Sequence, residues 1–469
     1  MVIITQTQKY FNEFQANSLT FHYRYDKIML PVRGADEQKY RRQRSCRHSA
    51  VCLRKRVSPP KRIQYLPYAL AIRANTLTAV TLVMRFRHFY LCGKRALARS
   101  FYQSKATEEL MDTFRVGIVG ATGMVGQRFV TLLEKHPWFT PTVLLASVKS
   151  AGKTYKSAVE GKWAMSSPIP AYAENMIVLD AEQDAAALKD KVDFIFCAVN
   201  MKKAEIQALE EKYARLEIPV ISNNSAHRFT DDVPMVIPEI NPEHLDVIPY
   251  QRKRLGTKRG FIAVKSNCSL QSYVPLLHPL LPFGIKQVAV CTYQAISGAG
   301  KTFTTMPEIV DNIIPYIGGE EEKSQQEPLK IWGSLSDGKI VCAQSPLITA
   351  QCLRVPVSDG HTAAVFVSFE QKPEKKEILR AWSAFKGAPQ ELKLPSAPEQ
   401  FIKYLEEDDR PQPKLDRDYG NGMGVCAGRL REDEVFDYKF IGLSHNTLRG
   451  AAGGAVLLAE LLAKKGYLN

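Results

Sequence analysis

Three side chains in the second half of the sequence could together form and resolve a covalent acyl intermediate. Cys268 supplies a thiol within the run Asn267-Cys268-Ser269, and His361 supplies an imidazole. Arg354 stands seven positions before the histidine and can hold a carboxylate with two parallel hydrogen bonds. A thiolate attacks a carbonyl carbon, and an imidazole can hold and return the proton. These residue types predict thiol-based chemistry on a small acid.

Each of these residues also has a plain structural interpretation. A lone cysteine is more often a small buried hydrophobic residue, and a lone histidine after a glycine is usually a hydrogen-bonded polar residue. The strand at 261–264 is expected to deliver Cys268 to a turn and then to a helix that begins at Ser269. A helix N-terminus favours the thiolate, so this position suits a nucleophile.

A nucleotide-binding unit is predicted upstream of the thiol. An apolar strand at 115–119 is followed by glycines at 120, 123 and 126 and by a helix at 127–134. This order lets a pyrophosphate approach the helix N-terminus, where unpaired N–H groups and the helix dipole favour negative charge. A strand–turn–helix unit that needs its glycines only for packing is the alternative interpretation.

The segment after the next strand, at 142–146, indicates which nicotinamide cofactor is used. It contains Ser147, Lys149, Ser150 and Lys153, and no acidic residue stands where an NAD enzyme presents one to the ribose hydroxyls. Hydroxyls and lysines suit a 2′-phosphate, so this segment favours NADP over NAD. A solvated polar loop is the alternative, because loops are polar in general.

The remaining hydrophobic pattern predicts the fold class. An amphipathic helix is expected at 203–215, and further strands of the same unit are expected at 192–199, 218–221 and 261–264. Alternating strands and helices predict a parallel, doubly wound sheet. The basic segment between Pro249 and Gly260 is interpreted as a solvated hairpin. Beyond Cys268, strands are expected at 288–293, 340–344 and 363–369.

The net charge of +15 suggests a nucleic-acid partner until it is divided along the sequence. Residues 1–112 carry 21 lysines and arginines against 7 acidic residues, a net +14, whereas residues 113–469 carry 42 against 41, a net +1. The basic extension at 1–112 could be an organelle-targeting segment or a nucleic-acid-binding arm. We favour a disordered segment, or one outside the working enzyme, because Met111 would make a natural start. A shorter chain beginning there should be as active as the full one.

Cysteine usage and hydropathy predict the surroundings of the protein. The nine cysteines form no CxxC pair and no zinc-type spacing with histidine. Neither a disulfide framework nor a metal site is predicted, so a reducing compartment is expected. The longest apolar stretch of the extension, near residues 77–84, is too short to span a bilayer. We therefore expect a cytoplasmic enzyme with no membrane or nucleic-acid partner, or an organellar one if residues 1–112 are a targeting segment.

Five motifs, in order along residues 114–469, resemble those of aspartate-semialdehyde dehydrogenase, particularly its archaeal and fungal branch. They are Gly120-Ala-Thr-Gly-Met-Val-Gly-Gln-Arg-Phe129, Ser266-Asn-Cys-Ser269, Tyr293-Gln-Ala-Ile-Ser-Gly-Ala-Gly300, Arg354-Val-Pro-Val-Ser-Asp-Gly-His361 and Asn446-Thr-Leu-Arg-Gly-Ala-Ala-Gly453. Residues 1–112 have no counterpart in the family. One departure concerns the segment after the nucleophile: many relatives have a small hydroxyl residue two positions after the cysteine, where this sequence has Leu270-Gln271.

The resemblance implies a role for each matching residue of the catalytic half. Cys268 would be the nucleophile, His361 the general acid/base, and Gln294 would orient the intermediate. Arg354 would hold the α-carboxylate of the substrate, and Asn267 would support the phosphate or the oxyanion.

The acidic run Gly319-Glu-Glu-Glu-Lys323 contributes further substrate contacts by the same resemblance. Glu320 would meet the amino group of the substrate, and Lys323 together with Arg228 would receive phosphate. The i, i+3 spacing to Lys323 selects Glu320 among the three acids, although Glu321 and Glu322 stay open. Without the resemblance, such a charge run is usually a solvated helix face.

The resemblance also implies the fold and the cofactor site. The class is α/β, with a Rossmann-type NADP-binding domain at 113–266 that a C-terminal helix at 445–469 joins, and an α+β catalytic and dimerisation domain at 267–444. NADP is the implied cofactor, no metal is implied, and a homodimer or homotetramer is expected. The residues implied to contact NADP are Gly120, Thr122, Gly123, Met124, Val125, Gly126, Ser147, Ser150, Lys153, Ser297, Gly298 and Asn446.

The implied activity is the NADPH-dependent reductive dephosphorylation of L-4-aspartyl phosphate to L-aspartate 4-semialdehyde, through a cysteine thioester. This is a step in the biosynthesis of lysine, methionine, threonine and isoleucine. Alternatives on the same scaffold are malonyl-CoA reductase and N-acetyl-glutamyl-phosphate reductase. A non-catalytic NADP-binding protein is a further alternative, but it would need none of Cys268, His361 and Arg354.

Overall fold

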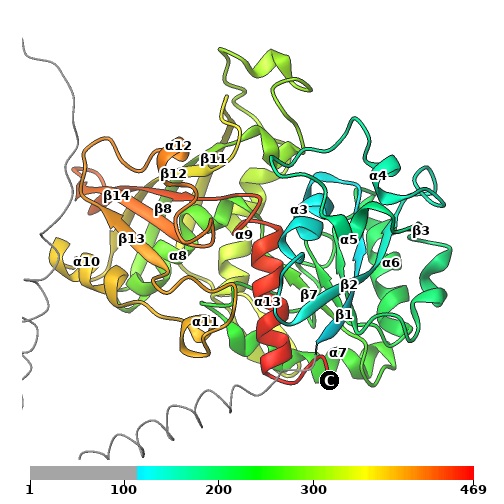
Figure 1. Cartoon of the computed structure of the whole chain (residues 1–469). Coiled ribbons are helices and arrows are strands. Elements are labelled where there is room, and N and C mark those ends of the chain that lie inside the picture. The colour runs from blue at the N-terminus through cyan, green and yellow to red at the C-terminus, as the bar shows by residue number, and fades with distance from the viewer. Residues whose placement is uncertain (1–112) are drawn as a thin grey trace, which may run out of the picture. The chain divides into compact units, whose positions relative to one another are not determined.

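The computed structural model describes residues 113–469, so the expectations for the extension at 1–112 and for a start at Met111 lie outside the described residues. In the described part, two large sheets carry most of the secondary structure (Figure 1). One is purely parallel and the other is mixed, as the predicted α/β class requires.

The first sheet has seven parallel strands in the order β3-β2-β1-β4-β5-β7-β6. Its strands are β1 (Phe114–Val119), β2 (Phe139–Ala146), β3 (Val178–Asp180), β4 (Phe194–Cys197), β5 (Val220–Ser222), β6 (Met235–Val236) and β7 (Ile262–Lys265). Alternate residues of these strands face opposite sides of the sheet. Both sides are buried, which explains why the strands are nearly continuous apolar runs.

Helices cover both faces of this sheet. On one face α3 (Met124–Leu132) packs through Phe129, whose ring stacks on Phe196 with centroids 4.4 Å apart. Burying such a ring contributes about 1.5–3 kcal/mol. The missing side chain of Gly126 lets α3 begin against the preceding turn, because a Cβ there would lie 2.1 Å from the carbonyl oxygen of Gly120. On the other face lies α6 (Lys203–Arg215), which has the predicted bounds.

The C-terminal helix returns to the first sheet. α13 (Ala452–Lys464) contacts α3, β5 and β7, and its apolar residues belong to the same buried cluster as Phe129. Figure 1 shows α13 in red beside the cyan α3. Almost the entire helix is buried. The C-terminal helix is thereby held against α3, the helix that follows the glycine-rich turn at 120–126.

The second sheet has six strands in the order β11-β8-β12-β15-β14-β13. They are β8 (Ile285–Gln294), β11 (Leu347–Arg354), β12 (His361–Phe369), β13 (Ile402–Leu405), β14 (Val425–Glu432) and β15 (Tyr438–Ser444). Along β12, buried and half-buried residues alternate. One face of this sheet is therefore covered by the chain, while the other is partly open.

Further helices and a two-stranded ribbon lie between the strands of the two sheets. Among the described residues they are α4 (Tyr155–Ala158), α5 (Ala171–Glu174), α7 (Ile248–Leu255), α8 (Val274–Leu277), α9 (Glu320–Ile331), α10 (Lys375–Ala384), α11 (Ala388–Glu391), α12 (Pro413–Asp416), β9 (Ser334–Ser336) and β10 (Lys339–Val341). No helix within residues 113–469 is long and apolar enough to cross a membrane. The same residues contain no cluster of His, Cys, Asp and Glu that could hold a metal ion.

Three local expectations were wrong. The basic segment after Pro249 is not a hairpin but the helix α7, which ends at Gly256 in the left-handed conformation. The strand expected at 340–344 is shorter and lies in a separate two-stranded ribbon with β9. After Cys268 the chain makes a single 3₁₀ turn, η4 (Ser269–Ser272), instead of a regular helix. A turn this short lacks the dipole that was expected to favour the thiolate.

Candidate active site

The predicted nucleophile and the predicted base meet at the junction of the two sheets. Cys268 follows the end of β7, whereas His361 is the first residue of β12. The Cys268 Sγ lies 3.4 Å from the His361 Nε2. Gln294 and Arg354 pair with each other at the ends of the parallel strands β8 and β11. Because β12 runs antiparallel to β8, the start of β12 and the ends of β8 and β11 share one edge of the second sheet.

The hydrogen bonds of His361 determine its tautomer. The backbone N–H of Ala295 donates to Nδ1 at 3.0 Å, so Nδ1 carries no proton. Burial, reinforced by Arg354, His445 and Lys265, holds the pKa of His361 well below its ordinary value. The imidazole is therefore neutral, with its proton on Nε2, and this N–H points at the sulfur of Cys268.

Opposing effects act on the thiol of Cys268. The residue is partly accessible to solvent, yet burial raises its pKa and the nearby carboxylate of Glu320 raises it further. Lys265, Arg228 and Arg354 oppose this increase in the pKa. The positive charge that supports the thiolate thus comes from side chains and not from a helix.

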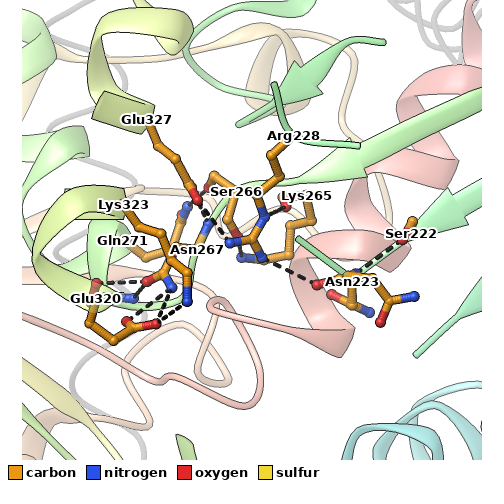
Figure 2. Close-up of polar contacts among 12 residues, drawn as sticks. Ser222, Asn223, Arg228, Lys265, Ser266, Asn267, Gln271, Glu320, Lys323 and Glu327 are labelled. Carbon is orange, nitrogen blue, oxygen red and sulfur yellow. Dashed lines mark hydrogen bonds and ion pairs between the residues drawn. The ribbon is translucent and has the colours of Figure 1, made fainter. Parts of the chain in front are cut away.

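Glu320 lies at the centre of a hydrogen-bonded cluster beside the nucleophile (Figure 2). Its carboxylate accepts from Asn267 Nδ2 at 3.0 and 3.1 Å, from Gln294 Nε2 at 3.3 Å and from Lys323 Nζ at 2.7 Å. Burial opposes ionisation of Glu320, but Lys323, Asn267 and Gln294 together lower its pKa. Glu321 bonds instead to Gln351 and the N–H of Cys352. Of the acids in this run, Glu320 therefore faces Asn267 and Gln294.

Arg354 is buried close to the imidazole of His361. Its Nη1 donates to the carbonyl oxygen of Ala295 at 2.7 Å, the side-chain hydrogen bond that the guanidinium makes within residues 113–469. Gly298 packs directly against the side chains of Arg354 and His361. A Cβ at this position would lie 2.9 Å from Arg354 Nη1 and 3.0 Å from His361 Cε1. A side chain there would displace the arginine or the histidine.

Arg228 is fixed by three hydrogen bonds of its guanidinium group (Figure 2). It donates from Nη1 to Glu327 at 2.9 Å, from Nε to the carbonyl oxygen of Lys265 at 3.0 Å and from Nη2 to that of Asn223 at 3.2 Å. Glu327 also accepts from the backbone N–H of Asn267 at 2.7 Å. The buried ion pair therefore anchors the loop of the nucleophile, and two of the five guanidinium N–H groups have no acceptor within the described part of the chain.

Asn446 connects three parts of the site. Its Oδ1 accepts from the backbone N–H of Gly360 at 2.8 Å, and its Nδ2 donates to Ser297 Oγ at 2.8 Å. Gly360 directly precedes His361. The segment before α13 therefore fixes both the loop that precedes His361 and the 3₁₀ turn at Ile296–Ala299, which contains Gly298.

The other predicted cofactor residues surround a separate cavity of about 450 Å³ at the carboxyl ends of the first-sheet strands. Gly120, Thr122, Gly123 and Ser147 line it. Met124, Val125 and Gly126 lie behind the turn in or next to the first turn of α3. Ser150 is buried, whereas Lys149 and Lys153 are exposed on the following turn. The glycine-rich turn and the cavity fit the phosphates of a dinucleotide.

Sequence reasoning missed three residues of the site. Lys265 is buried in β7, and the side-chain amide of Asn223 has no hydrogen-bond partner among residues 113–469. Gln271 explains the departure after the nucleophile. Its amide donates to Ser266 Oγ and accepts from Arg449 Nε, both at 2.9 Å. The longer side chain thus ties the nucleophile loop to the C-terminal segment, and only the unusual residue type signalled it.

Comparison with models of known protein families identifies the class of enzyme. The family model described as semialdehyde dehydrogenase, NAD binding domain, matches residues 115–248, and that described as semialdehyde dehydrogenase, dimerisation domain, matches residues 277–449. The fold and the site therefore define a semialdehyde dehydrogenase with a nicotinamide-binding part and an oligomerising part.

Named relatives narrow this class. Aspartate-semialdehyde dehydrogenase of Archaeoglobus fulgidus is 44% identical over 75% of this chain and 98% of its own length, and that of Aspergillus fumigatus is 41% identical over 76% and 98%. The Candida albicans enzyme, solved with NADP, superposes with a TM-score of 0.68 at 38% identity over 76% of this chain and all of the other. The chain belongs to the aspartate-semialdehyde dehydrogenase family.

Proposed function

We propose that this protein reduces L-4-aspartyl phosphate to L-aspartate 4-semialdehyde and phosphate, with NADPH, through a thioester on Cys268. The observation that carries the proposal is the 3.4 Å approach of the Cys268 Sγ to the His361 Nε2, with Arg354 and Glu320 beside them. Relatives with this name are 39–45% identical to the chain. A non-catalytic NADP-binding protein would need none of these groups.

The chemistry follows from the geometry of the thiol and the imidazole. The thiolate of Cys268 would attack the acyl carbon, the C–O bond to phosphate would break, and the released phosphate would take up one proton from solvent. NADPH, held at the glycine-rich turn of Gly120, Gly123 and Gly126, would supply the hydride that reduces the thioester, and Cys268 would be released as the thiolate when the C–S bond breaks. The Nε2–H of His361 is placed to stabilise the oxyanion in both steps. In the reverse direction the same N–H would stabilise the alkoxide of the thiohemiacetal from which the hydride leaves.

Substrate recognition is proposed from the charges around the thiol. Arg354 would hold the α-carboxylate, and Gln294 and Asn267 would orient the acyl group. Glu320 would receive the amino group. That ammonium would compete with Lys323 for the carboxylate, because the two residues form an ion pair of 2.7 Å without substrate. Lys323 would then be free to bind phosphate.

The phosphate end of the substrate would lie toward Arg228. Its two remaining guanidinium N–H groups are close to the side-chain amide of Asn223, which has no hydrogen-bond partner in the part of the chain that the structure describes. This arrangement supports a phosphate site that combines one buried charge with a neutral donor. Asn223 is added to the predicted set on this ground.

NADP is proposed as the preferred cofactor over NAD. Ser147 lines the cofactor cavity, and Lys149 and Lys153 are exposed on the turn that follows β2. Two exposed lysines can contact a 2′-phosphate without the desolvation cost of burying a charged group. The related Candida albicans enzyme was solved with NADP, which supports the same choice.

The oligomer is proposed to be a homodimer formed by the second sheet. The half-buried residues of β12 face away from the covered core, and the matching family model is that of a dimerisation domain. We also propose a reducing, cytoplasmic environment, since all six cysteines of the described residues are free. Light scattering of the purified protein would measure the dimer mass directly.

An NADPH oxidation assay tests the main proposal. The full chain is mixed with NADPH and L-4-aspartyl phosphate, and the fall in NADPH absorbance is recorded. Malonyl-CoA serves as the competing substrate. Oxidation with aspartyl phosphate, together with semialdehyde and phosphate as products, is expected. Oxidation with malonyl-CoA alone would overturn the proposal.

A further inference from the structure

Thr292 carries a buried hydroxyl group in a row of apolar side chains. It lies on β8 between Val290 and Gln294, and alternate residues of a strand face the same side of a sheet. Thr292 is completely buried, as are Val288 and Val290 on the same side. Burial of a hydroxyl is costly unless the group is hydrogen-bonded. A valine has the same shape, so packing alone does not explain the hydroxyl.

The hydroxyl of Thr292 accepts from the side-chain amide of Gln294. The Gln294 Nε2 lies 3.2 Å from the Thr292 Oγ1 and 3.3 Å from the Glu320 Oε2. Glu320 also accepts from Asn267 and Lys323 (Figure 2), as an ionised carboxylate does. A carboxylate can only accept, so the amide atom that faces it is the nitrogen. Thr292 and Glu320 together therefore determine which way round the amide lies.

This orientation leaves the carbonyl oxygen of the amide for a ligand. An amide nitrogen has two N–H donors, and those of Gln294 are directed at Thr292 and Glu320. Its Oε1 accepts no hydrogen bond from residues 113–469. Toward a bound molecule Gln294 is therefore an acceptor. An oxyanion needs donors, whereas an ammonium group needs acceptors.

A carboxylate-binding group lies beside this acceptor on the next strand. In the parallel pairing of β8 with β11, Arg354 is the direct partner of Gln294. α9 covers the same side, because Ser324, one turn after Glu320, contacts the Cys352 Sγ of β11 at 3.6 Å. A guanidinium, an amide oxygen and a carboxylate thus converge from three elements. An α-amino acid carries a carboxylate and an ammonium on one carbon atom, and these three groups match that arrangement.

We propose that Thr292 is a positioning residue that, with Glu320, holds the Gln294 amide so that its Oε1 accepts a hydrogen bond from the ammonium group of an amino-acid substrate. Glu320 supplies the charge for this ammonium, and Gln294 supplies a second, neutral acceptor. Thr292 itself does not touch the substrate. The inference rests on the proposed function, which places an aspartyl substrate at Cys268. Holding the ammonium orients the acyl group through the carbon chain of the substrate.

Two aldehydes that differ only in the amino group test this inference. L-Aspartate 4-semialdehyde carries the ammonium, and succinate semialdehyde lacks it but keeps the carboxylate and the aldehyde. Each is oxidised with NADP and phosphate, and the ratio of the two kcat/KM values is measured for the full chain and for Thr292→Val. The preference for the amino substrate should fall about three- to tenfold, because one hydrogen bond that orients the amide is lost. Thr292→Ser, which keeps the hydroxyl, should restore it.

Gln294→Met sets the upper limit of the effect, since it keeps the length of the side chain but removes the acceptor. The kcat/KM for aspartate semialdehyde should fall about ten- to a hundredfold, because the lost partner is an ionised group. The value for succinate semialdehyde should hardly change. Ser324→Ala is the matched control, because it removes a buried hydroxyl of the same layer that contacts Cys352 and not Gln294. Its preference should equal that of the full chain.

Equal losses with the two aldehydes in Gln294→Met would overturn the inference, because an amide that acts on the acyl group would not distinguish them. A loss of preference in Gln294→Met but not in Thr292→Val would refute the role of Thr292. Full chain that oxidises neither aldehyde would instead contradict the proposed function. Circular dichroism checks that each variant is folded. Thr292→Ala, which also lacks the hydroxyl, replaces the valine variant if that one is unfolded.

Competitive inhibition gives the same comparison if succinate semialdehyde is oxidised too slowly to measure. L-Aspartate and succinate also differ only in the amino group, and both would compete with aspartate semialdehyde. Their inhibition constants are measured for the full chain, Thr292→Val and Gln294→Met. The preference for L-aspartate should weaken in both variants, and more in Gln294→Met. An unchanged preference would contradict the inference.

Discussion

The candidate catalytic centre and the proposed site of the cofactor 2′-phosphate differ in how far the chain itself fixes their side chains. Glu320, Asn267, Gln294 and Lys323 are joined by hydrogen bonds before any substrate is present. Lys149 and Lys153, in contrast, lie exposed on a turn of the surface. Folding has therefore already ordered the side chains of the catalytic centre. The two exposed lysines would lose conformational entropy only when the cofactor binds.

This difference predicts that substitutions in the two regions act on different quantities. A side chain already held at the reacting atoms contributes to the transition state, so its loss should lower kcat. A side chain ordered only by the cofactor contributes to binding, so its loss should raise the KM for NADPH. The following substitutions test this division, from the largest expected effect to the smallest.

Cys268→Ala should reduce turnover to less than about 10⁻⁴ of its original value, because the thiol forms the covalent intermediate. Binding of NADP should remain nearly unchanged, since the glycine-rich turn is a separate part of the fold. Initial rates and cofactor titration measure the two quantities. Cys342→Ala, which removes another partly buried free cysteine, is the matched control. Substantial activity of Cys268→Ala would exclude the thioester mechanism.

Arg354→Leu should lower kcat/KM for the semialdehyde by two to four powers of ten. Loss of a charge-assisted clamp that leaves a carboxylate unpaired costs about 3 to 5 kcal/mol. Arg354→Lys should restore only part of this loss, since an ammonium group cannot form the two parallel hydrogen bonds. Steady-state kinetics of both variants provide the comparison. Normal kinetics for the leucine variant would remove Arg354 from the substrate site.

Gly298→Ala should lower kcat about 100-fold, because the new methyl group would displace Arg354 or His361 by a large part of an ångström. The affinity for NADPH should change less than kcat does. Ala299→Ser, at the exposed neighbouring position, serves as the control. An effect confined to the KM for NADPH would show that Gly298 belongs to the cofactor site alone.

Lys149→Glu combined with Lys153→Glu should raise the KM for NADPH about tenfold per lost phosphate contact and leave kcat almost unchanged. The KM for NADH should hardly move, since NADH lacks the 2′-phosphate. Lys135→Glu combined with Lys162→Glu, which changes two other exposed lysines of the nucleotide-binding part, controls for net charge. Equal changes with both cofactors would contradict the preference for NADP and would weaken the contrast between the two regions.

The sequence predicted the elements whose periodicity is strong and local. The helix at 203–215 has its predicted bounds, and β1 and β12 begin within two residues of their expected positions. Prediction failed where tertiary contacts decide the conformation. The basic segment after Pro249 becomes α7 because Ile248, Gln251 and Leu255 are buried on one side, a spacing hidden by its arginines and lysines.

The candidate site shows the same limit. Side-chain chemistry alone suggested Cys268, His361 and Arg354, because thiol, imidazole and guanidinium are informative residue types. Lys265 gave no such signal, since a lysine at the end of a strand is usually exposed. Its burial depends on α13, which lies almost 190 positions further along the sequence. Single-sequence patterns cannot register a contact over that separation.

The position of Asn446 has a consequence for the synthesis of the protein. The residues that brace Gly360, Ser297 and Gln271 all follow position 445, so a ribosome makes them after every other part of the site. A nascent chain can fold its glycine-rich turn and expose Cys268, but it cannot yet brace His361 against the thiol. We therefore expect the unfinished polypeptide to be catalytically inactive. Messenger RNAs truncated near their 3′ end should yield inactive protein instead of a partly active enzyme.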